Sequence, residues 1–171
     1  MANHWRETGD FYVSSLDGND TSGDGSIENP VKTISKAVLL VNAAGTNSQT
    51  IVVGTGVYTE GLTAVSSPLY TTIVGDGVVI LNGGGAGSAL SGYPSEWHIK
   101  NIHVVSFANL LNVSTNSGPQ WFNCTFKGIP VLLHLHMLAD VMFGIIVYSL
   151  VWSLIVRLTI LGIFIFIVVH L

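Results

Sequence analysis

Short runs of β-prone residues, separated by glycine-rich and polar stretches, fill positions 1–128 of the chain. Such runs predict strands, and the clusters of Gly, Asp, Asn and Ser between them predict turns. Phe11–Val13 and Thr50–Gly54 are the first two predicted strands. The polar stretch Asp17–Ser26 predicts a loop after the first strand, and Gly56–Glu60 predicts a turn after the second.

One segment between these strands has helical periodicity instead. Thr33 can cap the free amides of a helix that ends at about Ala44, and Gly45 suits the left-handed residue that follows a helix. The apolar positions have the i, i+3, i+4, i+7 spacing of one helix face: Ile34, Ala37, Val38 and Val41. We therefore predict an amphipathic helix with a single buried stripe.

A regular repeat relates the later runs. Ile51 precedes Ile73, and Lys100–Val104 precedes Phe122–Phe126, by the same interval of about 22 residues, a period typical of stacked solenoid repeats. The alignment pairs Ile102 with Cys124, Val104 with Phe126, and Asn101 with Asn123. It predicts inward apolar columns and an asparagine ladder. Two glycine groups predict corners: Gly75–Gly77 and Gly83–Gly85.

The segment from Tyr12 to Gly61 carries a resemblance to a known family. Its positions, in order and spacing, are Tyr12–Ser14, Gly18, Asp20, Gly23, Pro30, Thr33–Ile34, Ala37, Thr50–Ile51, Val53, Gly56, Tyr58 and Glu60–Gly61. They resemble the N-terminal cap of right-handed parallel β-helix proteins, which include pectate-lyase-like polysaccharide lyases and hydrolases, and also tail-spike and surface proteins. The resemblance implies an all-β fold: a right-handed parallel β-helix of about four rungs, an N-terminal capping α-helix and a hydrophobic C-terminal segment.

The same resemblance implies a role that faces carbohydrate. It implies polysaccharide as the partner, Ca²⁺ as a possible cofactor, and an extracellular, cell-surface or virion-associated location. About four rungs is close to the minimum of ~3 repeats at which a stacked solenoid becomes stable.

Charge is sparse along the chain. Charged residues make up 9% of the sequence and hydrophobic residues 49%, whereas about 25% charge is ordinary for a soluble domain. A net charge of −4 without a basic stripe argues against nucleic acid as a partner, because phosphate contacts need clustered Lys and Arg. Cys124 has no second cysteine with which to form a disulfide, and Met1–Glu7 lacks the apolar core of a signal peptide.

The pattern changes at Pro130, which suggests two regions. Residues 1–130 contain the predicted cap and rungs, and residues 131–171 form a hydrophobic tail. The last predicted rung ends near Gly128 without a visible cap. Because an uncapped rung exposes strand edges, we expect this end to pair with another copy of the chain.

The hydrophobic tail has three interpretations. Residues 141–169 are long enough for a membrane helix, because about 20 apolar residues span a bilayer, although Arg157 interrupts them. Ile163–Val169 is equally β-prone, and such a segment is either buried or aggregates. The abrupt change of pattern is also typical of a shifted reading frame. Periodicity does not separate these interpretations.

A window in the predicted cap loop is superficially similar to a calcium-binding EF-hand loop. Oxygen-bearing residues occupy positions 1, 3, 5 and 12: Asp17, Asn19, Thr21 and Glu28. However, Ser22 replaces the glycine of the sharp turn, Asp24 stands where an apolar residue belongs, and no helix precedes the window. A polar loop without a metal is the favoured interpretation.

Histidines provide a second pattern of metal ligands. His134 and His136 would lie on one side of a strand, with Asp140 as the nearest third ligand. Two histidines at an apolar boundary are more often interfacial, so this spacing alone does not predict a metal. His98 and His103 fall in a predicted rung, where solvated side chains are the simpler interpretation.

Lyases of the resembled family use a basic side chain to remove a proton beside a uronate carboxylate, while bound calcium neutralises the acid. The residues of the predicted rungs that could provide such a set are Glu96, Lys100 and Lys127. Ordinary surface charges are the favoured alternative for all three. We therefore expect the catalytic site that the resemblance implies to be incomplete in this chain.

Aromatic side chains that face outward could stack on sugar rings. The candidates are Trp97, Trp121 and Tyr93, with Tyr70 as a further one. Burial in the solenoid core is the alternative for each of them.

The resemblance implies a pectate-lyase-like domain that recognises or processes polysaccharide and lacks a complete catalytic site. One alternative is a structural or adhesive protein, such as a viral tail-spike or surface-fibre fragment. Another is a membrane-anchored surface module that uses residues 141–169.

Overall fold

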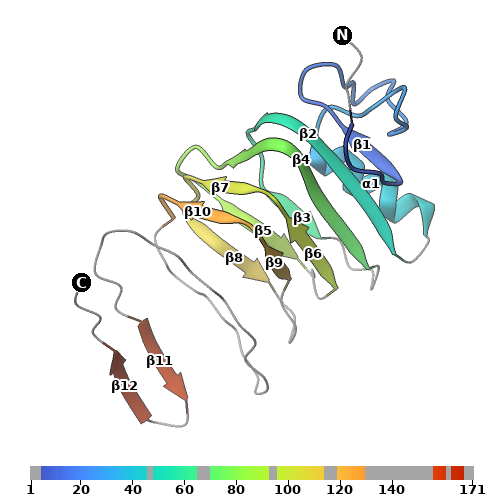
Figure 1. The fold of residues 1–171 in the computed structure, drawn as a ribbon. Helices are drawn as coiled ribbons and strands as arrows, with labels where there is room; N and C mark the ends of the chain where they lie inside the picture. Colours follow the sequence, from blue (N-terminus) through green and yellow to red (C-terminus); the bar gives the residue numbers. More distant parts are fainter. Residues whose placement is uncertain are drawn as a thin grey trace.

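The computed structural model describes residues 5–45, 48–64, 70–92, 96–113, 119–129, 156–160 and 163–167. This part of the chain is rich in strands and contains one helix (Figure 1). The elements are β1 (Phe11–Val13), α1 (Ile34–Ala44), β2 (Gln49–Tyr58), β3 (Leu62–Ala64), β4 (Thr71–Asn82), β5 (Ser88–Gly92), β6 (Trp97–Lys100), β7 (His103–Val105), β8 (Asn109–Val113), β9 (Gln120–Phe122), β10 (Thr125–Lys127), β11 (Val156–Ile160) and β12 (Ile163–Ile167).

Two parallel sheets form the body of the fold. The larger sheet has the order β1-β2-β4-β6-β9, and β7 joins it by pairing with both β4 and β10. The smaller sheet has the order β3-β5-β8. A third, two-stranded sheet is the antiparallel pair of β11 and β12. The prediction of a β-rich chain with one helix is thus confirmed, and both larger sheets are parallel, as in-register repeats require.

Residues in register on neighbouring strands form rows that face a shared core. The first inner row runs through β1, β2, β4, β6 and β9: Phe11, Ile51, Ile73, Ile99 and Trp121. The second inner row runs through β2, β4, β7 and β10: Tyr58, Leu81, Val104 and Phe126. The smaller sheet contributes Leu62, Leu90 and Leu111. One hydrophobic cluster contains members of both sheets and of α1.

The register predicted from the sequence repeat is confirmed where the structure describes it. Ile51 pairs with Ile73, and Val104 pairs with Phe126. Ile51, Ile73 and Ile99 have no exposed surface, and burial of one such side chain contributes roughly 1.5–3 kcal/mol. A one-residue slip would turn each of these side chains to the opposite face of the sheet, so burial fixes the register.

The predicted turn that begins at Gly56 and the predicted corner at Gly75–Gly77 both lie inside continuous strands. β2 continues through Gly56 to Tyr58, and β4 continues through Gly75–Gly77 to Asn82. The register shifts between Gly54 and Gly56, which leaves an extra residue on β4, and Gly77 has a φ of 100°. A bulge of this kind bends a strand without ending its ladder, so the corner predicted at Gly75–Gly77 is a bend within the continuous strand β4.

The predicted asparagine ladder is confirmed at the next corner. Asn101 and Asn123 have φ angles of 57° and 50°. Asn123 Nδ2 donates a hydrogen bond of 2.9 Å to Asn101 Oδ1. Asparagine is among the few residues that tolerate the left-handed region, so it can turn the chain here. Its side chain also links the two neighbouring chain segments by a hydrogen bond.

Helix α1 has the predicted ends and the predicted buried face. Thr33 Oγ1 accepts a hydrogen bond from the Lys36 amide at 3.2 Å, and Gly45 follows the helix in the left-handed conformation with a φ of 64°. Its buried residues are the predicted stripe: Ile34, Ala37, Val38 and Val41. This stripe joins the main core cluster beside β1 (Figure 1).

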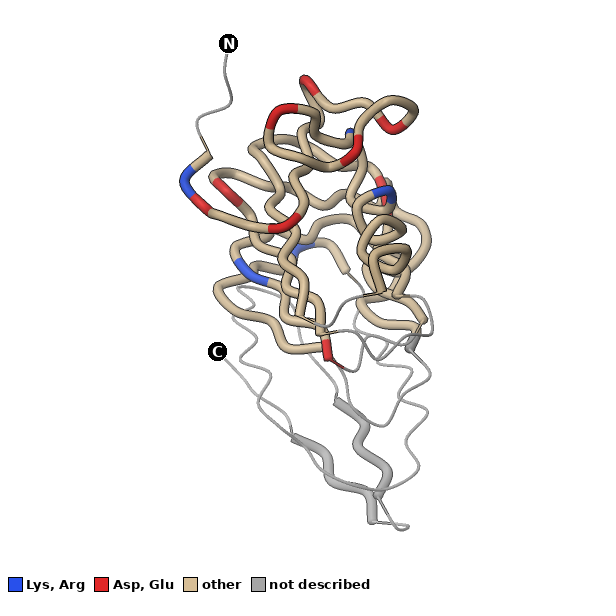
Figure 2. Tube along the Cα trace, turned by 90° about the vertical axis from the view of Figure 1, so that its right-hand side faces the viewer, with Lys and Arg blue, Asp and Glu red and all other residues tan. Residues whose placement is uncertain are grey.

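Asp20 links the preceding loop to the start of α1. Its carboxylate accepts hydrogen bonds from the amides of Lys32 and Thr33, at 2.8 and 3.0 Å, and from the Thr33 hydroxyl at 2.8 Å. Partial burial raises the pKa of Asp20, but the hydrogen bonds from Thr33 and Lys32 and the charge of Lys36 outweigh that effect, so the pKa lies below its ordinary value. Several acidic residues gather in this loop (Figure 2).

Glu60 supplies a second carboxylate to the same helix end. It accepts hydrogen bonds of 2.9 Å from the amides of Ile34 and Ser35, and a third from the Ser35 hydroxyl. The first amides of a helix have no partner within the helix, so these carboxylates satisfy groups that would otherwise need water. Because Glu60 follows β2, it also fixes the helix to the sheet.

The predicted tail, residues 131–171, lies outside the described residues except for β11 and β12. Within the described chain, no helix is long and apolar enough to cross a bilayer. The membrane-helix, buried-segment and shifted-frame interpretations of this tail, and the division at residue 130, stay predictions.

Replacement of Asp20 tests the carboxylate that caps α1. We expect Asp20→Ala to lose about 0.5–2 kcal/mol of unfolding free energy at pH 7, because the cap amides lose their acceptor. Urea unfolding followed by circular dichroism measures this. The lowered pKa means that the contribution is complete above the ordinary value of ~3.9 and disappears as the pH falls through the folded-state pKa. The difference from wild type should therefore shrink below about pH 4.

Asp17→Ala is the matched control, because Asp17 is an exposed carboxylate in the same loop. We expect it to change the unfolding free energy by less than about 0.5 kcal/mol. Equal losses in the two variants would show that Asp20 is not a cap.

Substitution of Asn101 tests the ladder corner. In an ordinary strand, Gly is less stable than Ala by roughly 0.5–1 kcal/mol. At Asn101 we expect the reverse order, because Asn101→Ala suffers left-handed strain of about 1–2 kcal/mol that Asn101→Gly avoids. Both variants lose the bond from Asn123, so the comparison isolates the backbone. A thermal melt in which the glycine variant is the less stable would contradict this.

Candidate functional site

A polar groove crosses the corner between the first and second inner rows, on the outer side of the larger sheet. Its volume is about 330 Å³. It is lined by Arg6, Glu7, Gly75, Asp76, Gly77, Asn101, His103, Asn123 and Thr125. These residues come from the N-terminal segment and from three successive passes of the chain through the corner. The passes are residues 75–77, 101–103 and 123–125, so no single stretch of sequence contains the site.

The strand register places His103 and Thr125 side by side in the groove. They pair between β7 and β10, and they alternate with the inner-row residues Val104 and Phe126, so their side chains point away from the core. His103 Nδ1 and Thr125 Oγ1 are 2.7 Å apart and share a hydrogen bond. This contact leaves Nε2 of the imidazole for a ligand.

The two ladder asparagines also retain hydrogen-bonding capacity. Their mutual bond uses Asn123 Nδ2 and Asn101 Oδ1. Asn101 therefore still has an amide donor, and Asn123 still has an amide oxygen, because each side chain offers both functions.

The N-terminal arm, defined as Trp5–Gly9, forms one wall of the groove. The Arg6 amide donates a hydrogen bond of 2.7 Å to Asp76 Oδ2. This bond brings Arg6 and Glu7 against residues far later in the chain. The groove thus holds two carboxylates, one guanidinium, one imidazole and two amides, which can donate and accept hydrogen bonds in many directions.

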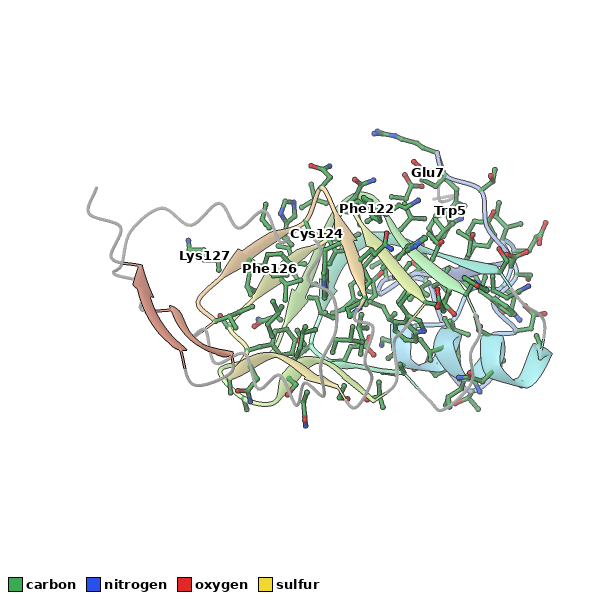
Figure 3. The ribbon with its side chains drawn as sticks, turned by 90° about the horizontal axis from the view of Figure 1, so that it is seen from below. Trp5, Glu7, Phe122, Cys124, Phe126 and Lys127 are labelled. Carbon is green, nitrogen blue, oxygen red and sulfur yellow. The ribbon has the colours of Figure 1, made fainter. Side chains whose placement is uncertain are left out.

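An exposed aromatic ring, Phe122, immediately precedes the groove residue Asn123. Phe122 is 43% exposed. The Lys100 ammonium lies 5.6 Å from its ring centre, and the His98 ring meets it edge-on with centroids 5.7 Å apart. Figure 3 shows Glu7 and Phe122 on the same side of the ribbon. An aromatic surface therefore lies beside the hydrogen-bonding groove.

The aromatic residues predicted to stack on sugars are placed differently from one another. Trp97 is 5% exposed and belongs to the core, so it has no ring face for a ligand, which corrects the stacking prediction for this residue. Trp121 packs partly against the core and meets Phe126 edge-on at 5.2 Å. Tyr70 is 53% exposed, and Tyr93 lies outside the described residues.

The predicted catalytic set is not brought together in the groove. Lys100 pairs in register with Phe122, whereas Lys127 pairs with Val105 in the second part of the sheet. Glu96 precedes β6, and its backbone carbonyl accepts a hydrogen bond from Thr71. None of the three predicted residues is among those that line the groove.

The window compared with a calcium loop is organised by its own hydrogen bonds. Asn19 Oδ1 accepts from the amides of Thr21 and Ser22, at 2.8 and 3.1 Å. Asp17 and Glu28 are exposed. In the part of the chain that the structure describes, no three His, Cys, Asp or Glu residues are grouped so that they could hold a metal ion.

The second metal pattern lies elsewhere. His134, His136 and Asp140 are outside the described residues, so their pairing stays a prediction.

The sequence repeat indicated part of the groove. His103 and Thr125 are one repeat apart in the sequence, as are Asn101 and Asn123, so polar residues at the repeat distance indicated a polar line along the outer surface. The arm had no such signal, because nothing periodic relates Arg6 to Asp76.

Comparison with known proteins identifies no relative: no family model, no curated protein and no solved structure matches the chain.

The thiol of Cys124 offers a test of local packing. Burial raises the pKa of Cys124, and backbone hydrogen bonding with Ile102 and Phe122 reduces that effect without cancelling it. Because the thiolate is the reactive form, we expect iodoacetamide to alkylate Cys124 several-fold more slowly than free cysteine at pH 8. Unfolding in guanidinium should abolish the difference. Equal rates before unfolding would mean that the thiol is open to solvent.

Proposed function

We propose that this chain is a polysaccharide-recognition module built on a short right-handed parallel β-helix, and that the polar groove binds the saccharide. The observation that carries the proposal is the alignment of outward polar groups from successive passes of the chain beside an exposed aromatic ring.

The parallel rows support the architectural part of the proposal. After Ile51, equivalent positions recur in the first inner row at intervals of about 22 to 26 residues, which are typical of solenoid turns. Helix α1 packs against the first strand, where a solenoid needs a cap. The sequence resemblance to the pectate-lyase-like cap covers the same residues.

The groove chemistry supports a ligand rich in hydroxyl groups. Arg6 and His103 can donate hydrogen bonds, whereas Glu7 and Asp76 can accept them. Sugars present donors and acceptors around the ring and also have an apolar face. Phe122 can contact that face while the groove residues bind the hydroxyls.

The groove residues fit the binding of polysaccharide better than its cleavage. The groove does not contain Glu96, Lys100 or Lys127, the residues that the family resemblance implied for proton abstraction. We therefore propose that the chain binds polysaccharide without cleaving it. An assay for unsaturated or reducing sugar ends released from the polymer would detect cleavage.

A structural or adhesive role is a second candidate, and one observation favours it. Among the described strands, β8, β9 and β10 each pair with a single neighbour and so have one free edge. Free edges favour association with another strand. Under this proposal a second copy of the chain pairs there, and the groove is a surface of the assembly.

A binding assay separates these candidates. We expect affinity electrophoresis of the full chain through gels containing neutral or acidic polysaccharides to show retardation in at least one polymer. The double variant Glu7→Ala/His103→Ala should weaken binding about tenfold. The reason is that two lost hydrogen bonds of roughly 0.5–1.5 kcal/mol each are together comparable to the roughly 1.4 kcal/mol that corresponds to a factor of ten.

Glu28→Ala, in the cap loop, is the control and should bind like wild type. Retardation that persists in the double variant would place the ligand elsewhere. No retardation in any polymer, together with a defined trimer or higher oligomer in light scattering, would favour the structural role.

A further inference from the structure

We propose that the N-terminal arm, Trp5–Gly9, is a hinged wall of the groove, which moves about Gly9 and is latched in its closed position by Trp5.

The latch is an apolar contact on the outer face of the larger sheet. Trp5 packs against a small cluster of Tyr12, Val52 and Val74, separate from the main core. The rings of Trp5 and Tyr12 meet edge-on with centroids 5.0 Å apart. Within the described chain, the buried Nε1 of Trp5 has no hydrogen-bond partner. Apolar burial thus favours the closed arm, while the unsatisfied donor reduces that preference.

The tether is one hydrogen bond at the edge of the groove. It joins the Arg6 amide to Asp76 Oδ2 at 2.7 Å, in an exposed position where water competes. Among the described residues, none provides a hydrogen-bond partner for the next two residues, Glu7 and Thr8. The middle of the arm is therefore held only through its two ends.

The hinge follows from the contrast between Gly9 and Asp10. The Asp10 amide donates to the Thr50 carbonyl at 2.9 Å, and the Thr50 amide donates to Asp10 Oδ2 at 2.8 Å, so the chain is fixed to β2 from Asp10 onward. The Gly9 amide, by contrast, donates to a side chain, the Tyr12 hydroxyl, at 3.1 Å. At Gly9, a Cβ atom would lie 2.8 Å from the Thr50 carbonyl oxygen and 2.6 Å from a Val52 methyl. The arm can lie against the sheet only because residue 9 lacks a side chain.

Closure places Arg6 and Glu7 in the groove, and opening removes both. A ligand that contacts them therefore stabilises the closed arm, because it binds the two positions with different affinity. This coupling to a saccharide rests on the proposed function. The hinge itself does not, since it is defined by contacts within the chain.

Footprinting of the two described histidines tests the hinge in the full chain. Diethyl pyrocarbonate modifies exposed imidazoles, and mass spectrometry reports His103 in the groove and His98 outside it as an internal reference. We expect Trp5→Ala and Gly9→Ala to speed the modification of His103 several-fold with His98 unchanged. Trp5→Phe, which keeps an aromatic latch, and Thr8→Ala should resemble wild type.

Hydrogen exchange of the wild-type chain provides the second measurement. We expect the amides of residues 6–8 to exchange at least tenfold faster than those of β2. An unchanged rate at His103 in both opening variants would show that the arm is not a wall of the groove. Amides of the arm protected as well as those of β2 would show that it is a fixed part of the sheet. If the footprint changes as expected but no polysaccharide binds, the proposed function fails and the hinge stands.

Discussion

The fold depends on keeping each inner-row residue directly over its equivalent on the neighbouring strand. Ile51, Ile73 and Ile99 are fully buried in one row, and the smaller sheet closes the same core from the other side. A slip of one residue would expose these side chains, so burial, and not turn chemistry, selects the pairing. Glycine bulges and left-handed asparagines then adapt the connections to a register that the core has already set.

The two ends of the first inner row are covered to different extents. At the β1 end, α1 covers the core. Glu60 accepts hydrogen bonds from the first amides of the helix, and Asp20 accepts one from the amide of Thr33, which caps the helix. These carboxylates come from either side of the helix in sequence, so the cap, the helix and the first two strands stabilise one another. At the other end, Trp121 and Phe126 remain partly exposed among the described residues. The core is thus covered by a helix at the β1 end and is only partly covered, among the described residues, at the other.

Features that follow a period were predictable from the sequence. The stripe of α1 follows from the helical period, and the pairing of Ile51 with Ile73 and the asparagine ladder follow from the longer repeat. The glycines Gly75–Gly77 indicated a corner, but only the pairing with the neighbouring strands reveals that β4 continues through it with a bulge. The arm was missed because the bond between Arg6 and Asp76 joins single residues far apart in the chain.

The unequal length of the corners has a consequence for the shape of the surface. From the first inner row to the second, β4 takes the longer path, Ile73 to Leu81, whereas the next pass takes the shorter one, Ile99 to Val104. The longer pass includes Asp76 and Gly77, which line the groove together with Asn101 and Asn123 of the shorter passes. The groove therefore lies where neighbouring passes of the chain differ in length. A change in the length of this corner would alter the residues that line the groove, whereas the inner rows on either side of it are fixed by their own pairing.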